Sequence, residues 1–220
     1  MDDRQLLDSR ESPSEEAIAR IDREFREGFA LLERIPQPAV AVFGSARVGE
    51  DDEAYAKARE VGAAFGRAGW AVITGGGPGA MAAANRGAQE AGGLSVGLGI
   101  DLPHEQAFNP YLDLAYEFEH FYARKVCFVK PSEGFVVVPG GFGTLDETFE
   151  ALTLIQTGKA EMFPVVLLGS GYWDGLLDWL RERVLATGKI APADLELVHK
   201  TDDPEVAARI VIDSYLLKTA

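Results

Sequence analysis

The stretch FVVVPGGFGTLDETFE, residues 135–150, decides the fold. It opens with four consecutive apolar residues, 135–138, a run typical of a short strand that is buried on both faces. The glycine-rich turn 139–143 follows, and a helical pattern begins at Thr144 and continues to about Thr157. A strand, a glycine turn and a helix in this order predict one unit of a parallel α/β sheet.

Similar units recur along the chain. Apolar runs predict further strands at residues 39–43, 70–73, 94–100, 116–118, 164–168 and 195–198. Helical patterns follow most of them, at residues 52–68, through Met81, Asn85 and Ala88, at 121–130 and 172–185, and after Asp203-Pro204. The alternation predicts an α/β fold: a single doubly wound, Rossmann-like parallel sheet with helices on both faces.

Residues 1–35 differ from the rest and predict an N-terminal helical extension to the Rossmann-like domain at residues 36–220. Apolar residues recur there every three or four positions, at Ile18, Ile21, Phe25, Phe29 and Leu32. Ser12-Pro13-Ser14-Glu15 predicts the helix start, with Ser12 as the cap, Pro13 at the first helical position and Glu15 closing a capping box.

The charge balance limits the class of ligand. The chain has 21 Lys+Arg against 35 Asp+Glu, a net charge of −14, which excludes a generally basic nucleic-acid-binding surface. No apolar run approaches the roughly 20 residues of a membrane span, and the acidic start lacks the apolar core of a signal peptide. The single cysteine, Cys127, lies in an apolar helical stretch and is expected to be buried. We therefore expect a cytoplasmic protein.

Three glycine-containing turns carry the candidate ligand-binding residues. Gly44-Ser45, residues 75–79 and residues 139–144 each follow a predicted strand and open a helix. Glycine lets the backbone approach a ligand closely, and a helix start offers unpaired N–H groups, so each turn is a candidate phosphate cradle. The candidates are Ser45, Gly76, Gly77, Gly140, Gly141, Gly143 and Thr144. No P-loop pattern is present, and the turn at 75–79 follows the second strand rather than the first, which disfavours a dinucleotide-dependent dehydrogenase.

Two further groups of residues each allow two interpretations. Thr144 stands where a helix cap is expected, so Glu147 is either its capping-box partner or a carboxylate at the mouth of the site. Arg124 and Lys125 are either a solvated helix face or cations for a phosphate or carboxylate. The histidines His104, His120 and His199 lack the spacing of metal ligands, so we expect no metal site.

Taken together, these motifs resemble the LOG ("Lonely guy") family, the cytokinin riboside 5′-monophosphate phosphoribohydrolases, many of which carry the label "possible lysine decarboxylase". The signature P-G-G-x-G-T-x-x-E is complete from Pro139 to Glu147, and the family's R-K pair is Arg124-Lys125. The resemblance covers roughly residues 35–215. Phe121 stands where the family has a methionine that lines the base pocket, and together with the long N-terminal helix it resembles the longer bacterial branch.

The resemblance implies hydrolysis of the N-glycosidic bond of a nucleoside 5′-monophosphate, without a cofactor, in a homo-oligomer (a dimer or a hexamer built of dimers). It implies catalytic roles for Glu147 and Arg124 and a phosphate site at Gly140, Gly141, Gly143 and Thr144. Ser45, Gly76, Gly77, Lys125 and Phe121 are further substrate-binding candidates, and Glu105 is a candidate contact to the base. A non-catalytic nucleotide or molybdenum-cofactor carrier on the same fold is the alternative, whereas no lysine stands in the context of a pyridoxal-dependent decarboxylase.

Overall fold

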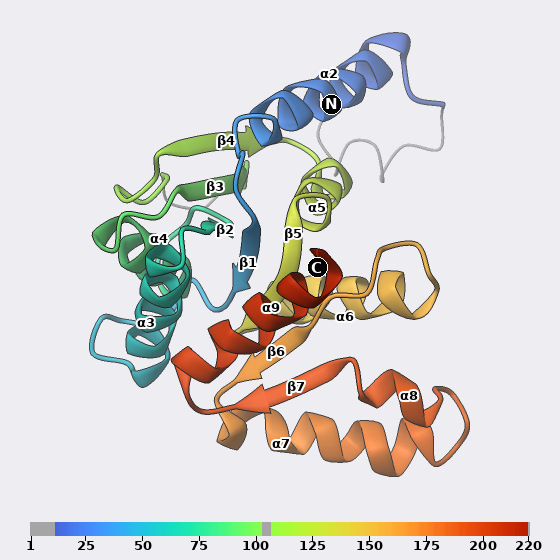
Figure 1. Cartoon of the computed structure of the whole chain (residues 1–220). Helices are drawn as coiled ribbons and strands as arrows, with labels where there is room; N and C mark the ends of the chain where they lie inside the picture. The colour runs from blue at the N-terminus through green and yellow to red at the C-terminus, as the bar shows by residue number, and fades with distance from the viewer. Residues whose placement is uncertain (1–11, 103–106, 220) are drawn as a thin grey trace.

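A computed structural model describes residues 12–102 and 107–219, and these residues form a seven-stranded, wholly parallel sheet in the order β4-β3-β2-β1-β5-β6-β7 (Figure 1). The strands are β1 Ala39–Phe43, β2 Ala71–Thr74, β3 Ser95–Ile100, β4 Leu114–Phe118, β5 Ser132–Val137, β6 Val165–Leu168 and β7 Val198–Thr201. The order runs outward in both directions from β1 and β5, so the predicted doubly wound fold is confirmed.

Helices cover both faces of the sheet. The helices are α2 Glu15–Leu32, α3 Glu53–Arg67, α4 Ala80–Glu90, α5 Phe121–Val129, α6 Phe142–Gln156, α7 Ser170–Trp179, α8 Pro192–Leu195 and α9 Pro204–Thr219, and α7 continues as a π-helical stretch, Leu180–Leu185. One buried cluster joins α3, α4 and α9 to the sheet, and the other joins α2, α5, α6 and α7 to its opposite face. Within the described residues, no helix is long and apolar enough to cross a bilayer.

The continuous apolar character of β1 follows from its central place. Val40 and Val42 belong to the cluster under α3 and α4, whereas Ala39, Ala41 and Phe43 belong to the opposite cluster. Because both faces are covered, every residue of the strand is buried, and alternation of polar and apolar residues is lost.

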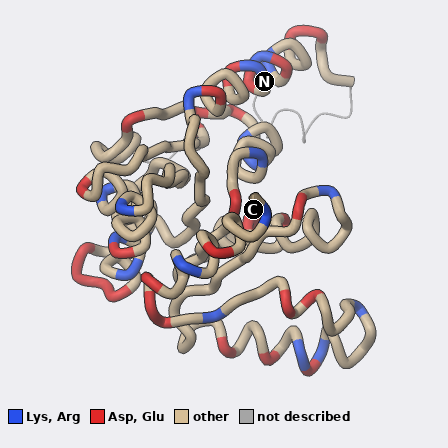
Figure 2. The backbone as a smooth tube through the Cα atoms, viewed as in Figure 1, with Lys and Arg blue, Asp and Glu red and all other residues tan. Residues whose placement is uncertain are grey.

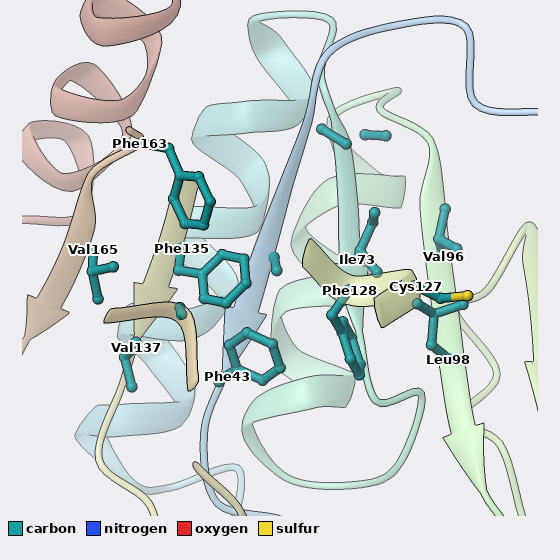
Figure 3. Packing of buried hydrophobic residues seen from close by; sticks show 14 of the residues in the cluster. Phe43, Ile73, Val96, Leu98, Cys127, Phe128, Phe135, Val137, Phe163 and Val165 are labelled. Carbon is teal, nitrogen blue, oxygen red and sulfur yellow. The ribbon is translucent and has the colours of Figure 1, made fainter. Parts of the chain in front are cut away.

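A row of aromatic rings fills the second cluster (Figure 3). The ring centroids of Phe43 and Phe135 lie 5.1 Å apart, those of Phe43 and Phe128 4.9 Å, and those of Phe135 and Phe163 5.0 Å. These tilted and edge contacts join α5 to β1 and β5 across the centre of the sheet, which ties the helix carrying Arg124 to the strand that feeds the glycine loop. Cys127, on the same helix, is buried as expected.

Several boundaries differ from the sequence-based prediction, among them the strand predicted at 135–138, which is β5 at 132–137. Three of the differences have a clear physical reason. The cap of α2 is Ser14, whose hydroxyl accepts the N–H of Ala17 at 3.2 Å, so Ser12 was the wrong cap. Helix α6 begins at Phe142 with Gly141 as its cap, so Thr144 lies inside the first turn. The last strand is 198–201 rather than 195–198, because Pro192 starts the short helix α8 there and the edge strand, half exposed, needs no apolar run.

The apolar stripe of α2 was also only partly correct. Its buried side is made of Ala17, Glu24, Gly28, Leu31 and Leu32, whereas Ile18 is 52% exposed. Ile21, Phe25 and Phe29 are half-buried at the margin of this side. Glu24 and Gly28 lie at the centre of the buried face, but neither is apolar. The apolar periodicity therefore predicted a buried face that is turned away from the observed one around the helix axis.

Two glycines allow helices α3 and α4 to touch through their backbones. A Cβ on Gly62 would lie 2.0 Å from the carbonyl oxygen of Ala84, and a Cβ on Gly87 would lie 1.9 Å from that of Arg59. Rigid backbone blocks both positions, so any side chain there would force the helices apart.

We therefore expect Gly62→Ala to destabilise the protein by about 1–3 kcal/mol, because overpacking outweighs the better helix propensity of alanine. Urea unfolding followed by circular dichroism measures this. Gly175→Ala, in the middle of α7 where a Cβ meets nothing within 4 Å, is the matched control and should instead add about 0.5–1 kcal/mol. Equal effects at both sites would contradict the close-packing argument.

Candidate active site

The three glycine-containing turns predicted from the sequence meet at one edge of the sheet, where the strand order reverses between β1 and β5. Ser45 joins them through its own backbone. Its N–H donates to the carbonyl of Pro139 at 3.1 Å, and its carbonyl accepts the N–H of Ala80 at 3.0 Å. The loops after β1, β2 and β5 are therefore one hydrogen-bonded unit.

Glycine is required where these loops cross. A Cβ on Gly44 would lie 2.3 Å from Cγ2 of Val138 and 2.6 Å from Cβ of Ala80. Gly79, the cap of α4, has φ +67°, and a Cβ there would lie 2.5 Å from the carbonyl oxygen of Ser45. The loops thus come together only because these positions carry no side chain.

A buried polar network, which the sequence reasoning missed, holds the second loop. The amide of Asn109 donates to the carbonyls of Gly76 at 2.9 Å and Gly77 at 3.0 Å and to Oδ1 of Asn85 at 3.0 Å. Thr74 donates to the same Asn85 oxygen at 2.6 Å and accepts the N–H of Gly76 at 2.9 Å. The one sequence signal was a lone asparagine, Asn85, in a helix otherwise built of small residues on its buried side.

The third loop runs directly into α6. The positive end of this 15-residue helix lies at Gly141, its cap, and favours an anionic group there. Beside Gly141 and Gly143 there is open space, since a Cβ on either would meet nothing within 4 Å. Thr144 is buried and packs against Gly140. The carbonyl of Gly140 accepts a hydrogen bond from the hydroxyl of Tyr172 at 2.7 Å. The loop is thus held by Thr144 and Tyr172 on one side, and there is open space beside Gly141 and Gly143 on the other.

Glu147 lies one turn further along α6 and is almost fully buried, at 4% exposure. Burial raises the pKa of its carboxyl from 4.5 to about 7, although the positive charges of Arg124 and Lys125 act in the opposite direction. Because Thr144 is the third residue of the helix rather than its cap, the capping-box interpretation of Glu147 is wrong. The carboxylate is not needed to close the helix end.

Arg124 and Lys125 are both largely buried against α6, so the interpretation as a solvated face is wrong. A guanidinium nitrogen of Arg124, Nη2, lies 3.7 Å from Oε1 of Glu147. Nζ of Lys125 lies 2.8 Å from Asp146 and 3.3 Å from Glu150. Burial lowers the pKa of Lys125, but the hydrogen bond that it donates to Asp146 and the charge of Glu150 leave this pKa above its ordinary value.

The remaining candidates lie around this pair. Phe121, at the start of α5, is 38% exposed, and its ring centroid lies 5.5 Å from the guanidinium carbon of Arg124. The ring centroid of Phe128 lies 5.4 Å from the same guanidinium carbon, so two aromatic rings contact Arg124. Glu105 lies outside the described residues. Among those that are described, no three His, Cys, Asp or Glu side chains come together to hold a metal ion.

The charges around the site are close to balanced. The two cations of α5 face three carboxylates of α6, Asp146, Glu147 and Glu150. Figure 2 shows acidic and basic residues interspersed along the helices and outer loops. An anionic ligand here would depend on backbone N–H groups and the start of α6 as much as on the side-chain cations.

These features define a class: Rossmann-like α/β proteins with a ligand site of glycine loops at the topological switch point and a buried carboxylate beside an arginine. The chain belongs to the LOG family, whose model, described as "possible lysine decarboxylase", matches residues 81–211. The resemblance stated from the motifs is thereby confirmed.

Two curated relatives carry the same name. The chain is 35% identical over 155 residues to the cytokinin riboside 5′-monophosphate phosphoribohydrolase of Mycobacterium tuberculosis, covering 69% of this chain and 82% of that protein. It is 33% identical over 145 residues to the protein of the same name from Mycobacterium marinum, covering 65% and 77%.

Solved structures similar to this chain include proteins that are named for a molybdenum cofactor. The molybdenum cofactor carrier protein of Chlamydomonas reinhardtii superposes with a TM-score of 0.61 at 27% identity, over 82% of this chain and 99% of that one. The molybdenum cofactor binding protein of Rippkaea orientalis has a TM-score of 0.59 at 24% identity, over 82% and 98%, and shows the shared fold alone.

The burial of Glu147 predicts a stability penalty that depends on pH. Below pH 4.5 the carboxyl is protonated in both the folded and the unfolded chain; as pH rises to about 7, the unfolded chain ionises first and folding loses free energy. We expect Glu147→Gln to be more stable than the wild type by about 3 kcal/mol at pH 8, and by less than about 0.5 kcal/mol at pH 4.5. Urea unfolding at both pH values measures this. The exposed Glu60→Gln is the control, and a gain that does not change with pH would contradict the assignment.

Proposed function

We propose that this protein hydrolyses the N-glycosidic bond of a nucleoside 5′-monophosphate and releases the free base and ribose 5-phosphate. The observation that carries the proposal is the buried Glu147 carboxylate, 3.7 Å from Arg124 and one turn beyond the glycine loop at the start of α6. The names of the curated relatives support it, and the family membership of the chain makes those names relevant.

Glu147 suits the chemistry of this reaction. As the bond between C1′ and the base breaks, the ribose acquires oxocarbenium character, which a nearby carboxylate stabilises. The same carboxylate accepts a proton from the water that attacks C1′. A pKa of about 7 makes Glu147 a stronger base than an ordinary glutamate while leaving much of it ionised at neutral pH.

The other side chains divide into binding roles. The N–H groups of Gly140, Gly141 and Gly143 and the hydroxyl of Thr144 would hold the 5′-phosphate at the positive end of α6. Arg124 keeps its charge at any working pH and so is no proton donor; it would hold the ribose or phosphate and orient Glu147.

Further candidates complete the substrate site in this proposal. Ser45, Gly76 and Gly77 line the neighbouring loops that the Ser45 backbone joins to the Gly140 loop. Phe121 would face the base, and Glu105 remains a proposed contact to it. Lys125, held by Asp146 and Glu150, would act mainly by fixing the charge around Glu147.

Two other functions are less well supported. A decarboxylase would need a lysine able to form a Schiff base, but two carboxylates hold Lys125 in its charged form. A carrier for a molybdenum cofactor is favoured only by the structural likeness to such proteins. A protein that only binds a ligand has no evident use for a carboxylate buried at a cost in stability beside an arginine.

An assay of base release tests the proposal. Purified protein is given AMP, GMP, CMP, UMP and an N6-prenylated AMP, each with its dephosphorylated nucleoside as control, and free base is measured by chromatography. We expect release from at least one 5′-monophosphate and a large loss of kcat/KM with the matching nucleoside, because the phosphate site supplies binding energy. Tight binding without release from any of them would favour the carrier.

Glu147→Gln is the control variant for this assay. It keeps the size of the side chain but removes its charge and basicity, so we expect kcat to fall at least about 100-fold. Nucleotide binding, measured by calorimetry, should remain, since the phosphate site is separate. Near wild-type turnover in this variant would remove Glu147 from the mechanism.

We propose in addition that the protein is a homo-oligomer, a dimer or a hexamer built of dimers. Exposed apolar side chains lie on α5 and α6, the two helices that carry Arg124 and Glu147: Phe121, Tyr122, Val126, Phe142 and Phe149. Phe142 is 92% exposed at the tip of the glycine loop, an unusual place for a large apolar group unless a second subunit covers it.

Light scattering of the full chain should therefore give a mass of at least two subunits. Val126→Glu, at one of these exposed apolar positions on α5, should lower the mass to that of a monomer because a buried charge is costly at an interface. Leu217→Glu, an equally drastic change at an 82% exposed position on α9, should leave the mass unchanged. A monomeric wild type would contradict the proposal.

The remaining proposals concern the setting of the enzyme. We propose that residues 36–220 form the catalytic domain and residues 1–35 an extension to it. The buried, reduced thiol of Cys127 and a nucleotide substrate suit the cytoplasm. If prenylated AMP is the preferred substrate in the assay above, the reaction contributes to cytokinin biosynthesis.

A further inference from the structure

The N-terminal helix α2 contacts the helix that carries Arg124 through a buried carboxylate. Glu24 is only 6% exposed, in the middle of α2. It accepts a hydrogen bond from the backbone N–H of Glu119 and pairs with Nδ1 of His120 at 2.8 Å. His120 is itself fully buried, and neither residue has a role in the mechanism above.

These contacts hold the two residues that precede α5, Glu119 and His120. His120 is the cap residue of α5, but its side chain makes no capping hydrogen bond to the helix. The negative charge of Glu24 instead lies against the segment that leads into the helix, where the helix dipole is positive. A buried carboxylate is costly unless hydrogen bonds compensate it, so this one has a defined geometry.

The same segment determines where Arg124 lies. The backbone N–H of Arg124 donates to the carbonyl of His120 at 3.3 Å, in the first turn of α5. One helical turn further on, Gly28 of α2 packs against Cys127, where a Cβ would lie 2.8 Å from the sulfur. Figure 1 shows α2 lying beside β4 and α5. Helix α2 therefore fixes α5 on both sides of Arg124.

We propose that Glu24 and His120 are positioning residues for Arg124, so that the N-terminal helix is part of the working enzyme rather than an appendage. This inference rests on the proposed function. Glu24 holds His120, His120 sets the first turn of α5, and that turn places the guanidinium 3.7 Å from Glu147. A shift of about 1 Å in such a group costs up to roughly 100-fold in rate.

The first test compares two glutamates of the same helix. We expect Glu24→Gln to lower kcat/KM for AMP, or for the best substrate of the panel, by at least about tenfold. Glu27→Gln is the matched control: Glu27 lies three residues on and accepts the hydroxyl of Tyr116 on β4 rather than touching α5. It should leave kcat/KM unchanged. Equal effects of the two changes would overturn the proposal.

A double-mutant cycle with Arg124→Lys separates positioning from a general loss of stability. If Glu24 acts through Arg124, Glu24→Gln should cost much less in the Arg124→Lys background than in the wild type. Fully additive effects would mean that Glu24 acts elsewhere and would overturn the proposal.

Two replacements of His120 test the imidazole contact. His120→Asn keeps a donor near the position of Nδ1 and should retain most of the activity. His120→Leu removes the donor and leaves the Glu24 carboxylate buried with one partner fewer, so it should behave like Glu24→Gln. Equal activity of the two variants, with both folded by circular dichroism, would contradict the role of His120.

Hydrogen exchange followed by mass spectrometry distinguishes failure of this inference from failure of the proposed function. Glu24→Gln should speed amide exchange in peptides covering residues 119–125, and Glu27→Gln should not. This result is readable even if the wild type cleaves no nucleotide. Unchanged exchange in Glu24→Gln would overturn the inference whatever the protein hydrolyses.

Discussion

The architecture of the site depends on two backbone hydrogen bonds of Ser45. Its N–H donates to the carbonyl of Pro139, and its carbonyl accepts the N–H of Ala80. They join the loops after β1, β2 and β5 only because Gly44 and Gly79 leave room for the chains to touch. The three loops thereby form one continuous surface at the carboxyl ends of the strands, and the N-terminus of α6 points towards this surface. The side chains that carry the chemistry come from α5 and α6, and the aromatic row packs α5 against β1 and β5, the strand that leads into α6.

The net charge of −14 suggests a negative site, and the pair Arg124-Lys125 suggests a positive one; the site is neither. The cations of α5 are engaged by carboxylates of α6, so neither sign dominates locally. Binding of a small anion then relies on geometry at short range, which a distant acidic surface scarcely weakens. The site also keeps Glu147 in a partly protonated state, which a strongly positive pocket would not allow.

The sequence was informative wherever a residue's role depends on its neighbours in the chain. Residues 39–43 were predicted with the right bounds because a doubly covered strand is apolar throughout. The three loops and the Arg124–Glu147 pair followed from motifs. Glu24 and Asn109 were missed because their partners lie far away in sequence, at His120 and at Gly76. The edge strand β7 was misplaced because its exposed residues carry no burial signal.

The contact between Gly28 and Cys127 has a chemical consequence. Burial raises the pKa of this thiol, the only one in the chain, to about 11, so it stays protonated and poorly nucleophilic as long as α2 covers it. Lifting of α2 would uncover the sulfur. Because Cys127 is the only cysteine, its reactivity with an alkylating reagent would report whether the contact with the N-terminal helix is intact.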